Sequence, residues 1–275
     1  MHATEYQFIR DLVYQHSRIN LGPDKRELVS ARLAKRLRAM QVPSVGDYCA
    51  LLRSPEGEDE LGNLIDAIST NHTYFFREEG HFDALKQVIL PELVRRREQE
   101  RWPQLRVWSA ACSSGEEPYS VAIFLSEYFK SAPGWPWQVE ATDISRRVLT
   151  RAAQGVYPSD AVSRIDPRWV KTYFNVGYGP QDGNYRVRAT VRDRVRFSHL
   201  NLLEGTPPFP QPFHIIFCRN VMIYFDRPTQ QELVNRLRRL LVPGGFLMVG
   251  HSESLTNIEH DLKMIRPATY RAPSA

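Results

Sequence analysis

The segment from Arg106 to Ser120 constrains the fold of this chain more than any other part of its sequence. An apolar run around Val107 leads into small residues, two acids and an amphipathic segment that continues to Phe129. This order predicts a β-strand, a tight turn and an α-helix, as in a doubly wound α/β sheet. We therefore expect a nucleotide-like ligand in the crevice beyond the strand end. The small residues of the turn would let that ligand approach the backbone closely; they are Ala110, Ala111, Ser113, Ser114 and Gly115.

Two adjacent acids at the helix entrance, Glu116 and Glu117, restrict the kind of ligand that this turn can bind. A phosphate-binding turn would keep carboxylates away from the anion, so these acids favour a cationic or hydroxyl-rich ligand. The next predicted strand, Gln138 to Thr142, ends in Asp143, and an acid there commonly accepts hydrogen bonds from ribose hydroxyls. These features point to S-adenosylmethionine, which carries an ammonium and a sulfonium group. The alternative is an ordinary turn with helix-capping glutamates.

Length and composition exclude several classes of protein. The 275 residues suffice for one large domain or for a domain with a smaller one. Neither a membrane-spanning apolar run nor a signal-like stretch occurs, so we expect no membrane insertion. Cys49, Cys112 and Cys218 are far apart and lack CxxC spacing, which favours a reducing cytoplasm over disulfides or a thiolate metal site. HExxH and other metal-binding spacings are also missing, so we expect no metal.

Residues up to about Ser69 carry helix signals and almost no strand signal. We expect one helix that ends near Ile19 and three more that cover residues 24–40, 46–53 and 58–69. In the segment 24–40, Val29, Leu33 and Leu37 fall on one side at helical spacing, with Met40 beyond them. Basic residues occupy the other sides of the helix and are Lys25, Arg32, Lys35, Arg36 and Arg38. They form either a solvated face or a docking surface for an acidic helix or a nucleic acid.

An unusual polar and aromatic segment, Asn71 to Glu78, joins this helical region to the α/β region. It contains Asn71, Thr73, three consecutive aromatic residues and Arg77. In one interpretation the aromatics cover an adenosyl ligand and Arg77 points at an anion. In the other, the segment is a packed linker and Arg77 pairs with a local acid. A basic helix from Glu79 to Arg101 follows, with a kink or restart at Pro91.

Residues 173–197 interrupt the α/β alternation. A glycine-rich turn, VGYGPQDGN, precedes YRVRATVRDRVRF, in which arginine alternates with apolar residues at period two. This pattern predicts a small antiparallel β insertion before a sheet strand at Val195 to His199. The arginines either lie on a solvated sheet face or flank an exposed edge that accepts an acidic peptide as an extra strand; they are Arg186, Arg188, Arg192, Arg194 and Arg196.

Polar residues follow a buried strand predicted at Phe213 to Cys218. Arg219, Asn220 and Tyr224 would face the same crevice as Asp143 and are candidates for direct ligand contacts. Further on, Pro243 to Gly245 predicts a turn before a buried strand at Phe246 to Val249.

The segment His251 to Ser254 contains serine, histidine and acid side chains. It does not indicate a hydrolase, because the sequence lacks a GxSxG nucleophile turn and because neighbours in sequence do not have triad geometry.

Three stretches, taken together, are characteristic enough to indicate a protein family: NHTYFFRE at 71–78, VWSAACSSGEEPYS at 107–120 and FCRNVMIYFD at 217–226. They strongly resemble the CheR family of chemotaxis receptor glutamate methyltransferases, and the similarity extends over nearly the whole chain. The resemblance implies an α/β class I S-adenosylmethionine-dependent methyltransferase fold, a Rossmann-like doubly wound sheet, in residues 91–275. It also implies an N-terminal all-helical domain (1–70), a linker that contributes to the cofactor site (71–90) and a small antiparallel β subdomain inserted at 173–194.

Carried over position by position, the resemblance implies a cofactor site for S-adenosylmethionine and its product S-adenosylhomocysteine. The expected cofactor-binding residues are Asn71, Thr73, Arg77, Glu117, Asp143, Asn201, Leu202, Arg219 and Asn220. Among them, Glu117 is expected toward the amino-acid end of the cofactor and Asp143 at its ribose. Asn201 and Leu202 are expected on the adenine side.

The resemblance places Arg77 and Tyr224 nearest the transferring methyl group, as the catalytic candidates. A glutamate acceptor, with a pKa near 4.3, is ionised at neutral pH and needs no general base. The task is to desolvate the carboxylate, align it with the sulfonium methyl group and exclude water. An arginine and a tyrosine orient a carboxylate without titrating, so we expect Arg77 to position the acceptor more than to activate it.

The resemblance also implies partners. The basic helix, through Lys25, Arg32, Lys35, Arg36 and Arg38, would meet the methylation helices of a receptor. The β subdomain of some family members grips an acidic, aromatic peptide at the receptor's C-terminus, and the GYGPQDG turn is similar to that type. One alternative is a nucleic-acid methyltransferase, although a Pro-Pro motif flanked by polar and aromatic residues does not follow the fourth strand. Another is a cofactor-binding adaptor without catalysis. The sequence demands no more than a monomer.

Overall fold

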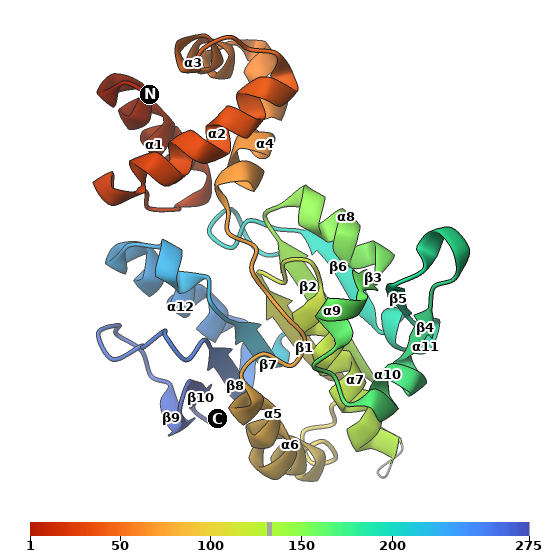
Figure 1. Cartoon of the computed structure of the whole chain (residues 1–275). Helices are drawn as coiled ribbons and strands as arrows, with labels where there is room; N and C mark the ends of the chain where they lie inside the picture. The colour runs from red at the N-terminus through yellow and green to blue at the C-terminus, as the bar shows by residue number, and fades with distance from the viewer. Residues whose placement is uncertain (131–133, 275) are drawn as a thin grey trace.

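In the computed structural model, which describes residues 1–130 and 134–274, a helical domain is joined to a larger α/β domain (Figure 1). The helical domain has the elements expected from sequence, with short 3-10 turns between them. They are α1 (Ala3–Ser17), η1 (Pro23–Lys25), α2 (Arg26–Met40), α3 (Val45–Arg53), η2 (Pro55–Gly57) and α4 (Glu58–Ile68). Ser44 caps α3 by accepting a hydrogen bond from the Asp47 amide, which fixes where that helix begins.

The helical domain has its own apolar core, which includes Ile9, Leu33 and Leu64. Helix α2 contributes Val29 and Leu33 to it, while Met40 is exposed. The polar side of α2 differs from the single basic face expected from sequence. Lys25, Lys35 and Arg38 are exposed. Arg32 and Arg36 are half-buried and make their hydrogen bonds inside the protein.

The chain then passes through the linker into α5 (Glu79–Ala84), the π-helical segment η3 (Leu85–Ile89) and α6 (Leu90–Arg96). The expected break at Pro91 takes the form of this wider π turn, directly before the proline. Proline has no amide hydrogen and its ring crowds the preceding turn, and a local π-helical turn accommodates both effects. The regular helix ends at Arg96, five residues before the expected end.

The main sheet has the order β6-β2-β1-β7-β8-β10-β9. Strands β6 through β8 pair in parallel, and β10 pairs antiparallel with both β8 and β9. The strand order reverses between β1 and β7, so a crevice opens at the carboxyl ends of these two strands. The strands are β1 (Leu105–Ala110), β2 (Trp137–Asp143), β6 (Val195–His199), β7 (Phe213–Cys218), β8 (Leu241–Val249), β9 (Lys263–Arg266) and β10 (Thr269–Arg271).

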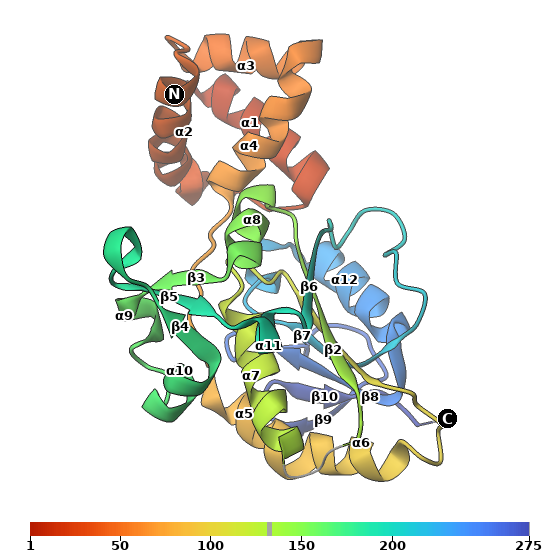
Figure 2. The ribbon, with the colours of Figure 1, turned by 90° about the vertical axis from the view of Figure 1, so that its right-hand side faces the viewer.

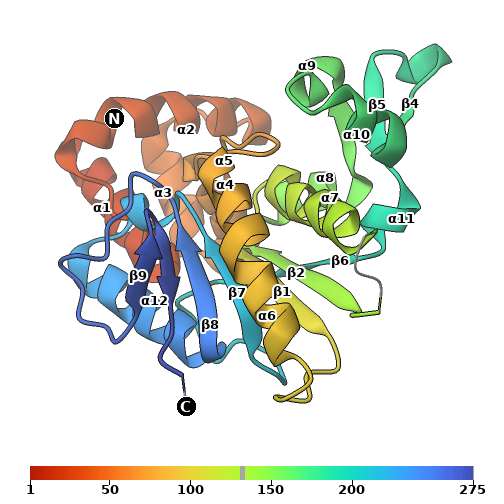
Figure 3. The same ribbon diagram turned by 90° about the horizontal axis from the view of Figure 1, so that it is seen from below.

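Helices cover both faces of this sheet, as a doubly wound fold requires (Figure 3). Val107 of β1 packs in one core with residues of α6 and α7 (Glu116–Lys130). The next residue, Trp108, packs in a second core with α12 (Arg227–Arg239) on the opposite face. Helix α8 (Arg146–Gln154) follows β2. In the described part of the chain, every helix is too short or too polar to cross a membrane.

The segment Pro243–Gly245 was expected as a turn, and the structure shows that this prediction is wrong. These residues lie inside β8 as an irregularity: Phe213 pairs with Leu241, and Ile215 pairs with Phe246. Strand β7 advances by two residues between these pairs while β8 advances by five. The side chain of Arg96 donates hydrogen bonds to the carbonyls of Pro243 (2.8 Å) and Gly244 (3.2 Å), which satisfies backbone groups that the irregular pairing leaves free.

A small antiparallel sheet projects from the α/β domain (Figure 2). Its order is β3 (Val156–Pro158), β5 (Asn184–Val187) and β4 (Phe174–Val176). It therefore also uses residues 156–158, which precede the segment expected from sequence. The arginine-rich run is not one strand, because α11 (Ala189–Arg192) separates β5 from β6. Short helices complete this region: α9 (Ser159–Val162), α10 (Pro167–Tyr173) and the 3-10 turn η4 (Gly179–Gln181).

Candidate active site

A cavity of about 1020 Å³, measured with its open mouth, lies at the carboxyl edge of β1, β2 and β7. Its walls come from the α/β domain, from the linker and from the end of α1, through Ser17 and Ile19. The structure brings together at this cavity every residue that the sequence analysis assigned to cofactor binding or catalysis. They are Asn71, Thr73, Arg77, Glu117, Asp143, Asn201, Leu202, Arg219, Asn220 and Tyr224.

The turn after β1 has an unusual backbone. Ala111 (φ 65°) and Ser113 (φ 51°) are both left-handed, which non-glycine residues rarely adopt and which concentrates at functional sites. Both residues line the cavity. Gly115 does not, contrary to expectation: at its φ of +97°, a Cβ would lie 2.8 Å from the Tyr157 hydroxyl and 2.9 Å from the Ala152 Cβ. The glycine is thus required for packing against α8 and the small sheet rather than for ligand approach.

Asp143, at the end of β2, is almost fully buried, with 6% of its surface exposed. One carboxylate oxygen accepts a hydrogen bond from the Ser113 amide (2.8 Å) and the other from the Ser145 amide (2.9 Å). Burial raises the pKa of Asp143, and these two amides oppose that rise. The carboxylate is therefore held in one orientation at the cavity wall, as a group that binds ribose hydroxyls must be.

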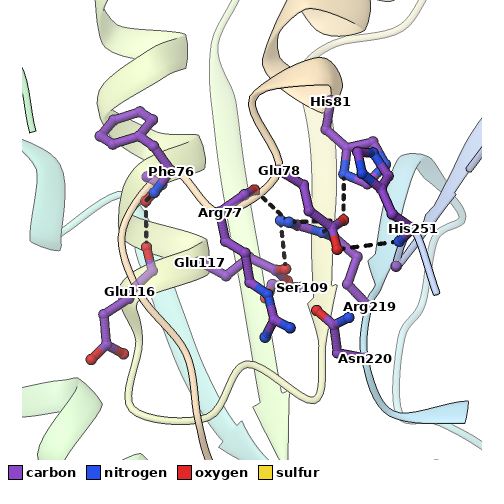
Figure 4. Close-up of polar contacts among 12 residues, drawn as sticks. Phe76, Arg77, Glu78, His81, Ser109, Glu116, Glu117, Arg219, Asn220 and His251 are labelled. Atoms are coloured by element: carbon purple, nitrogen blue, oxygen red, sulfur yellow. Dashed lines mark hydrogen bonds and ion pairs between the residues drawn. The ribbon is translucent and has the colours of Figure 1, made fainter. Parts of the chain in front are cut away.

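The two acids at the start of α7 have different environments (Figure 4). The Glu116 carboxylate accepts a hydrogen bond from the Ser114 hydroxyl (2.7 Å) and is not part of the cavity wall. Glu117 lines the cavity, where it accepts hydrogen bonds from the Ser109 hydroxyl (2.7 Å) and from Arg219 (3.1 Å). Burial raises the pKa of Glu117, and Arg219 opposes that rise. Only one of the two acids is thus available to a ligand.

Arg219 is the centre of a buried network, with 2% of its side chain exposed. Its guanidinium lies 3.1 Å from Glu117 on α7 and 3.1 Å from Glu78 in the linker, and it also donates to the carbonyl of Arg77. Burial raises the pKa of Glu78, but the charge of Arg219, the backbone amide of His251 and the nearby histidines together outweigh this effect and hold the pKa below its usual value. Most donors of Arg219 are therefore committed to the protein, so that it braces the cavity wall.

The guanidinium of Arg77 forms no ion pair with its neighbour Glu78. Its guanidinium donates to the His72 carbonyl (3.1 Å) and lies over the Tyr74 ring at 5.6 Å. The local acid, Glu78, pairs with Arg219 instead. Arg77 thus keeps donors available at the cavity, as expected if it faces an anion. The aromatic residues 74–76 do not line the cavity, and Phe75 packs in the core, so the expectation that they cover the ligand is wrong.

The loop after β7 carries Asn220 and Tyr224 and is held by an acid that the sequence analysis did not assign to the site. The buried carboxylate of Glu253 accepts hydrogen bonds from the backbone amides of Asn220 (2.8 Å), Met222 (2.7 Å) and Gly250 (2.6 Å). Asn220 has a φ of 58°, and Tyr224 lies in the 3-10 turn η5 (Met222–Tyr224). Glu253 therefore fixes the backbone of this loop; its position just past a buried strand was the only signal in the sequence.

The helical domain closes one side of the cavity through hydrogen bonds that the sequence could not indicate. The Asn20 amide donates to the Tyr224 carbonyl (2.8 Å), and the Asn201 side chain donates to the His16 carbonyl (2.8 Å). Close by, the Tyr14 hydroxyl donates to Asp226 (2.7 Å), which also caps α12. The position of Tyr224 thus depends on how α1 packs against the α/β domain.

The charges around the cavity fit a ligand that is cationic at one end and carries hydroxyl groups. Glu117 provides a held carboxylate for an ammonium group, and Asp143 provides one for hydroxyls. Arg77 adds a cation at the same wall. The two acids match S-adenosylmethionine, which carries an ammonium group and ribose hydroxyls.

Comparisons with known proteins agree with this fit. Residues 71–271 match the family described as CheR methyltransferase, SAM binding domain, and residues 4–69 match CheR methyltransferase, all-alpha domain. The chemotaxis protein methyltransferase of Salmonella typhimurium (strain LT2) is 42% identical over 265 residues, which cover 96% of this chain and 88% of that protein. That of Borreliella burgdorferi is 40% identical over 262 residues, which cover 94% of this chain and 91% of that protein.

Among solved structures, the magnesium protoporphyrin IX methyltransferase of Synechocystis PCC 6803 with bound SAH is 17% identical. The match covers 66% of this chain and 61% of the Synechocystis chain, with a TM-score of 0.32. This likeness is too distant to bear on function. The family matches, in contrast, cover both domains, and the curated relatives are matched over most of their length. The chain therefore belongs to the CheR family of chemotaxis protein methyltransferases and is an S-adenosylmethionine-dependent methyltransferase.

Proposed function

We propose that the protein transfers a methyl group to glutamate side chains of chemotaxis-type receptors, forming the glutamyl methyl esters used in sensory adaptation. The observation that carries this proposal is the placement of Arg77 and Tyr224 at the same cavity as Glu117 and Asp143. A cation and a phenol beside the cofactor site are suited to orient an incoming carboxylate. The family relationship supports the same acceptor class.

In the proposed reaction, the bound cofactor supplies an electrophilic methyl group on its sulfonium and leaves as S-adenosylhomocysteine. A glutamate oxygen forms the new C–O bond while the C–S bond breaks, so the negative and positive charges are both neutralised. Arg77 and Tyr224 hold the acceptor carboxylate in line with the methyl group. The carboxylate is already ionised, so none of the protein's groups has to remove a proton.

The proposed cofactor contacts follow from the cavity wall. Glu117, oriented by Ser109 and Arg219, receives the ammonium group, and Asp143 receives the ribose hydroxyls. We assign Asn201 and Leu202 to the adenine side. The remaining residues of the expected site contribute backbone and side-chain surface to the same wall and are Asn71, Thr73, Arg219 and Asn220. Arg219 acts mainly by holding Glu117 and the linker.

We further propose that α2 meets the acidic methylation helices of the receptor. Lys25, Lys35 and Arg38 are exposed and carry this role, whereas Arg32 and Arg36 contribute less because their guanidinium groups are engaged within the protein. Long-range attraction between these charges and acidic helices would speed association.

A second receptor contact is proposed at the small sheet. Strand β4 forms an edge of that sheet. Its last residue, Val176 (64%), and Tyr178 (87%) just beyond it are strongly exposed. An open edge with exposed apolar side chains is suited to an acidic, aromatic peptide that adds a strand. We propose that the protein works as a cytoplasmic monomer, that methyl transfer itself uses no metal, and that nucleic acid is not its substrate.

The proposal is tested by transfer of labelled methyl groups to receptor-containing membranes, followed by mild base. Base releases the label from glutamyl esters but not from methylated amines. Arg77→Ala and Tyr224→Phe are each expected to lower turnover by about 100-fold or more, because the acceptor is no longer aligned. Calorimetry should show that both variants still bind S-adenosylhomocysteine. Base-stable label, or unchanged turnover in both variants, would exclude the proposed chemistry.

A further inference from the structure

Two histidines and a carboxylate meet behind the cavity and have no part in the proposed transfer. Glu78 comes from the linker, His81 from α5 and His251 from the loop after β8 (Figure 4). One side-chain oxygen or nitrogen atom from each residue lies within 4.8 Å of the others. The His81 Nδ1 atom is 3.3 Å from a Glu78 oxygen, and the two imidazole rings are 5.0 Å apart. Segments distant in sequence thus bring three potential ligand atoms to one point.

His81 is the unexplained member of this cluster. Its side chain is almost entirely buried, yet among the described residues neither ring nitrogen has a hydrogen-bond partner of acceptable geometry. A buried polar group without a partner costs free energy and is rare in native proteins. Its proximity to Glu78 and His251 shows where a ligand for one of those nitrogens would lie.

The chemistry of the cluster is that of a transition-metal site. Imidazole nitrogen and carboxylate oxygen bind Zn²⁺ at about 2.0–2.2 Å, and two such ligands in a tetrahedron are separated by roughly 3.3 Å. The separation of His81 and Glu78 agrees with this value. Three protein ligands of this type leave a fourth position for water. We propose that Glu78, His81 and His251 form a binding site for a divalent transition-metal ion of the Zn²⁺ class.

The surroundings of the cluster give an ion access from solvent and orient the Glu78 carboxylate. His251 is exposed, so an ion has an entry path from solvent. The Glu78 carboxylate is oriented by Arg219 and by the backbone amide of His251 (3.2 Å), as carboxylate ligands usually are. The positive charge of Arg219, 3.1 Å from Glu78, opposes a dication, so we expect weaker binding than at a structural zinc site with four ligands.

The test uses the complete chain without a histidine tag, after treatment with a chelator. Titration with Co²⁺ is expected to produce saturable visible absorption from nitrogen and oxygen ligands, and calorimetry with Zn²⁺ is expected to give one ion per chain. His251→Ala, at an exposed position, should lower the affinity for Zn²⁺ by at least about tenfold. His16→Ala removes another exposed histidine and serves as the matched control, with unchanged affinity.

His81→Gln provides a second variant, examined after circular dichroism has shown that it is folded; it should lose the Co²⁺ absorption. Three results would overturn the proposal: no saturable binding to the parent protein, an equal loss in His16→Ala and His251→Ala, or full binding in the folded His81→Gln protein. None of these results depends on methyl transfer, so the metal site stands or fails separately from the proposed function.

Discussion

Two networks that hold an arginine against buried carboxylates can be compared, one from each domain. In the helical domain, Arg36 on α2 donates two hydrogen bonds to Glu60 on α4, and Tyr48 on α3 donates a third. In the α/β domain, Arg219 lies between Glu78 and Glu117. Both networks pair a guanidinium with a carboxylate, but the backbones that carry these groups differ.

The first network joins regular helices of one domain, within 24 residues of sequence. The second joins segments separated by 141 residues, and Glu78 and Asn220 beside it are both left-handed, at φ 62° and 58°. It lies at the strand ends, where one of its carboxylates lines the cavity. A buried arginine pair can therefore fix helix packing or fix a ligand site, and its position at the sheet edge distinguishes the two.

The largest expected effect comes from Arg219→Met, which removes the guanidinium and keeps an apolar side chain of similar length. Glu78 and Glu117 would remain buried without their cation, which destabilises a protein by about 3–5 kcal/mol. Glu117 would also lose its orientation, so affinity for S-adenosylhomocysteine should fall by roughly 10- to 150-fold. Urea unfolding and calorimetry measure the two effects. Unchanged affinity in the folded variant would contradict the role of Arg219 as a brace of the site.

Arg36→Met is the matched change in the other network. Here the expected loss of stability is about 2 kcal/mol, because Arg36 is 22% exposed and water reaches part of the site. Affinity for S-adenosylhomocysteine should stay within twofold, since this network is confined to α2, α3 and α4. The same urea and calorimetric measurements apply. A large loss of cofactor affinity would show that the helical domain is coupled to the cavity more tightly than the comparison implies.

Much of the fold followed from local sequence patterns. The helices of the first domain and the strands Val195–His199 and Phe213–Cys218 match the expected elements. Periodicity and capping residues act locally, and the carboxyl ends of parallel strands necessarily meet at one edge. For this reason the polar residues after β2 and β7 could be assigned to one cavity before their distances were known.

What could not be predicted depends on tertiary contacts. Helical spacing put both Arg36 and Arg38 away from the apolar side of the helix, but only Arg36 faces a buried acid from another helix. The role of Glu253 depends on the amides of Asn220 and Met222, which lie 33 and 31 residues away, and a one-dimensional pattern carries no signal for them. Similarly, Pro243–Gly245 has the residues typical of a turn, but its pairing with β7 makes it part of a strand.

The smallest expected effects concern pH, where Glu60 of the first network and Glu117 of the second should respond in opposite directions. Burial raises the pKa of Glu60, but its bonds with Arg36 and Tyr48 outweigh this effect and hold the pKa below its usual 4.5. The stability that Glu60 contributes is therefore present above about pH 4.5 and is lost as the pH falls through the lowered value. Burial raises the pKa of Glu117 above 4.5. Its ionised form therefore opposes folding, and this cost disappears as the pH falls from the raised value toward 4.5.

Glu60→Gln and Glu117→Gln separate these contributions, since glutamine does not titrate. Urea unfolding at constant ionic strength should show that the advantage of the parent protein over Glu60→Gln shrinks with acidification. Relative to Glu117→Gln, the parent should instead gain stability as the pH falls, because protonated Glu117 no longer carries the cost of a buried charge. Equal slopes for the two variants would mean that both carboxylates have the same environment, and the distinction between a packing network and a site network would then rest on position alone.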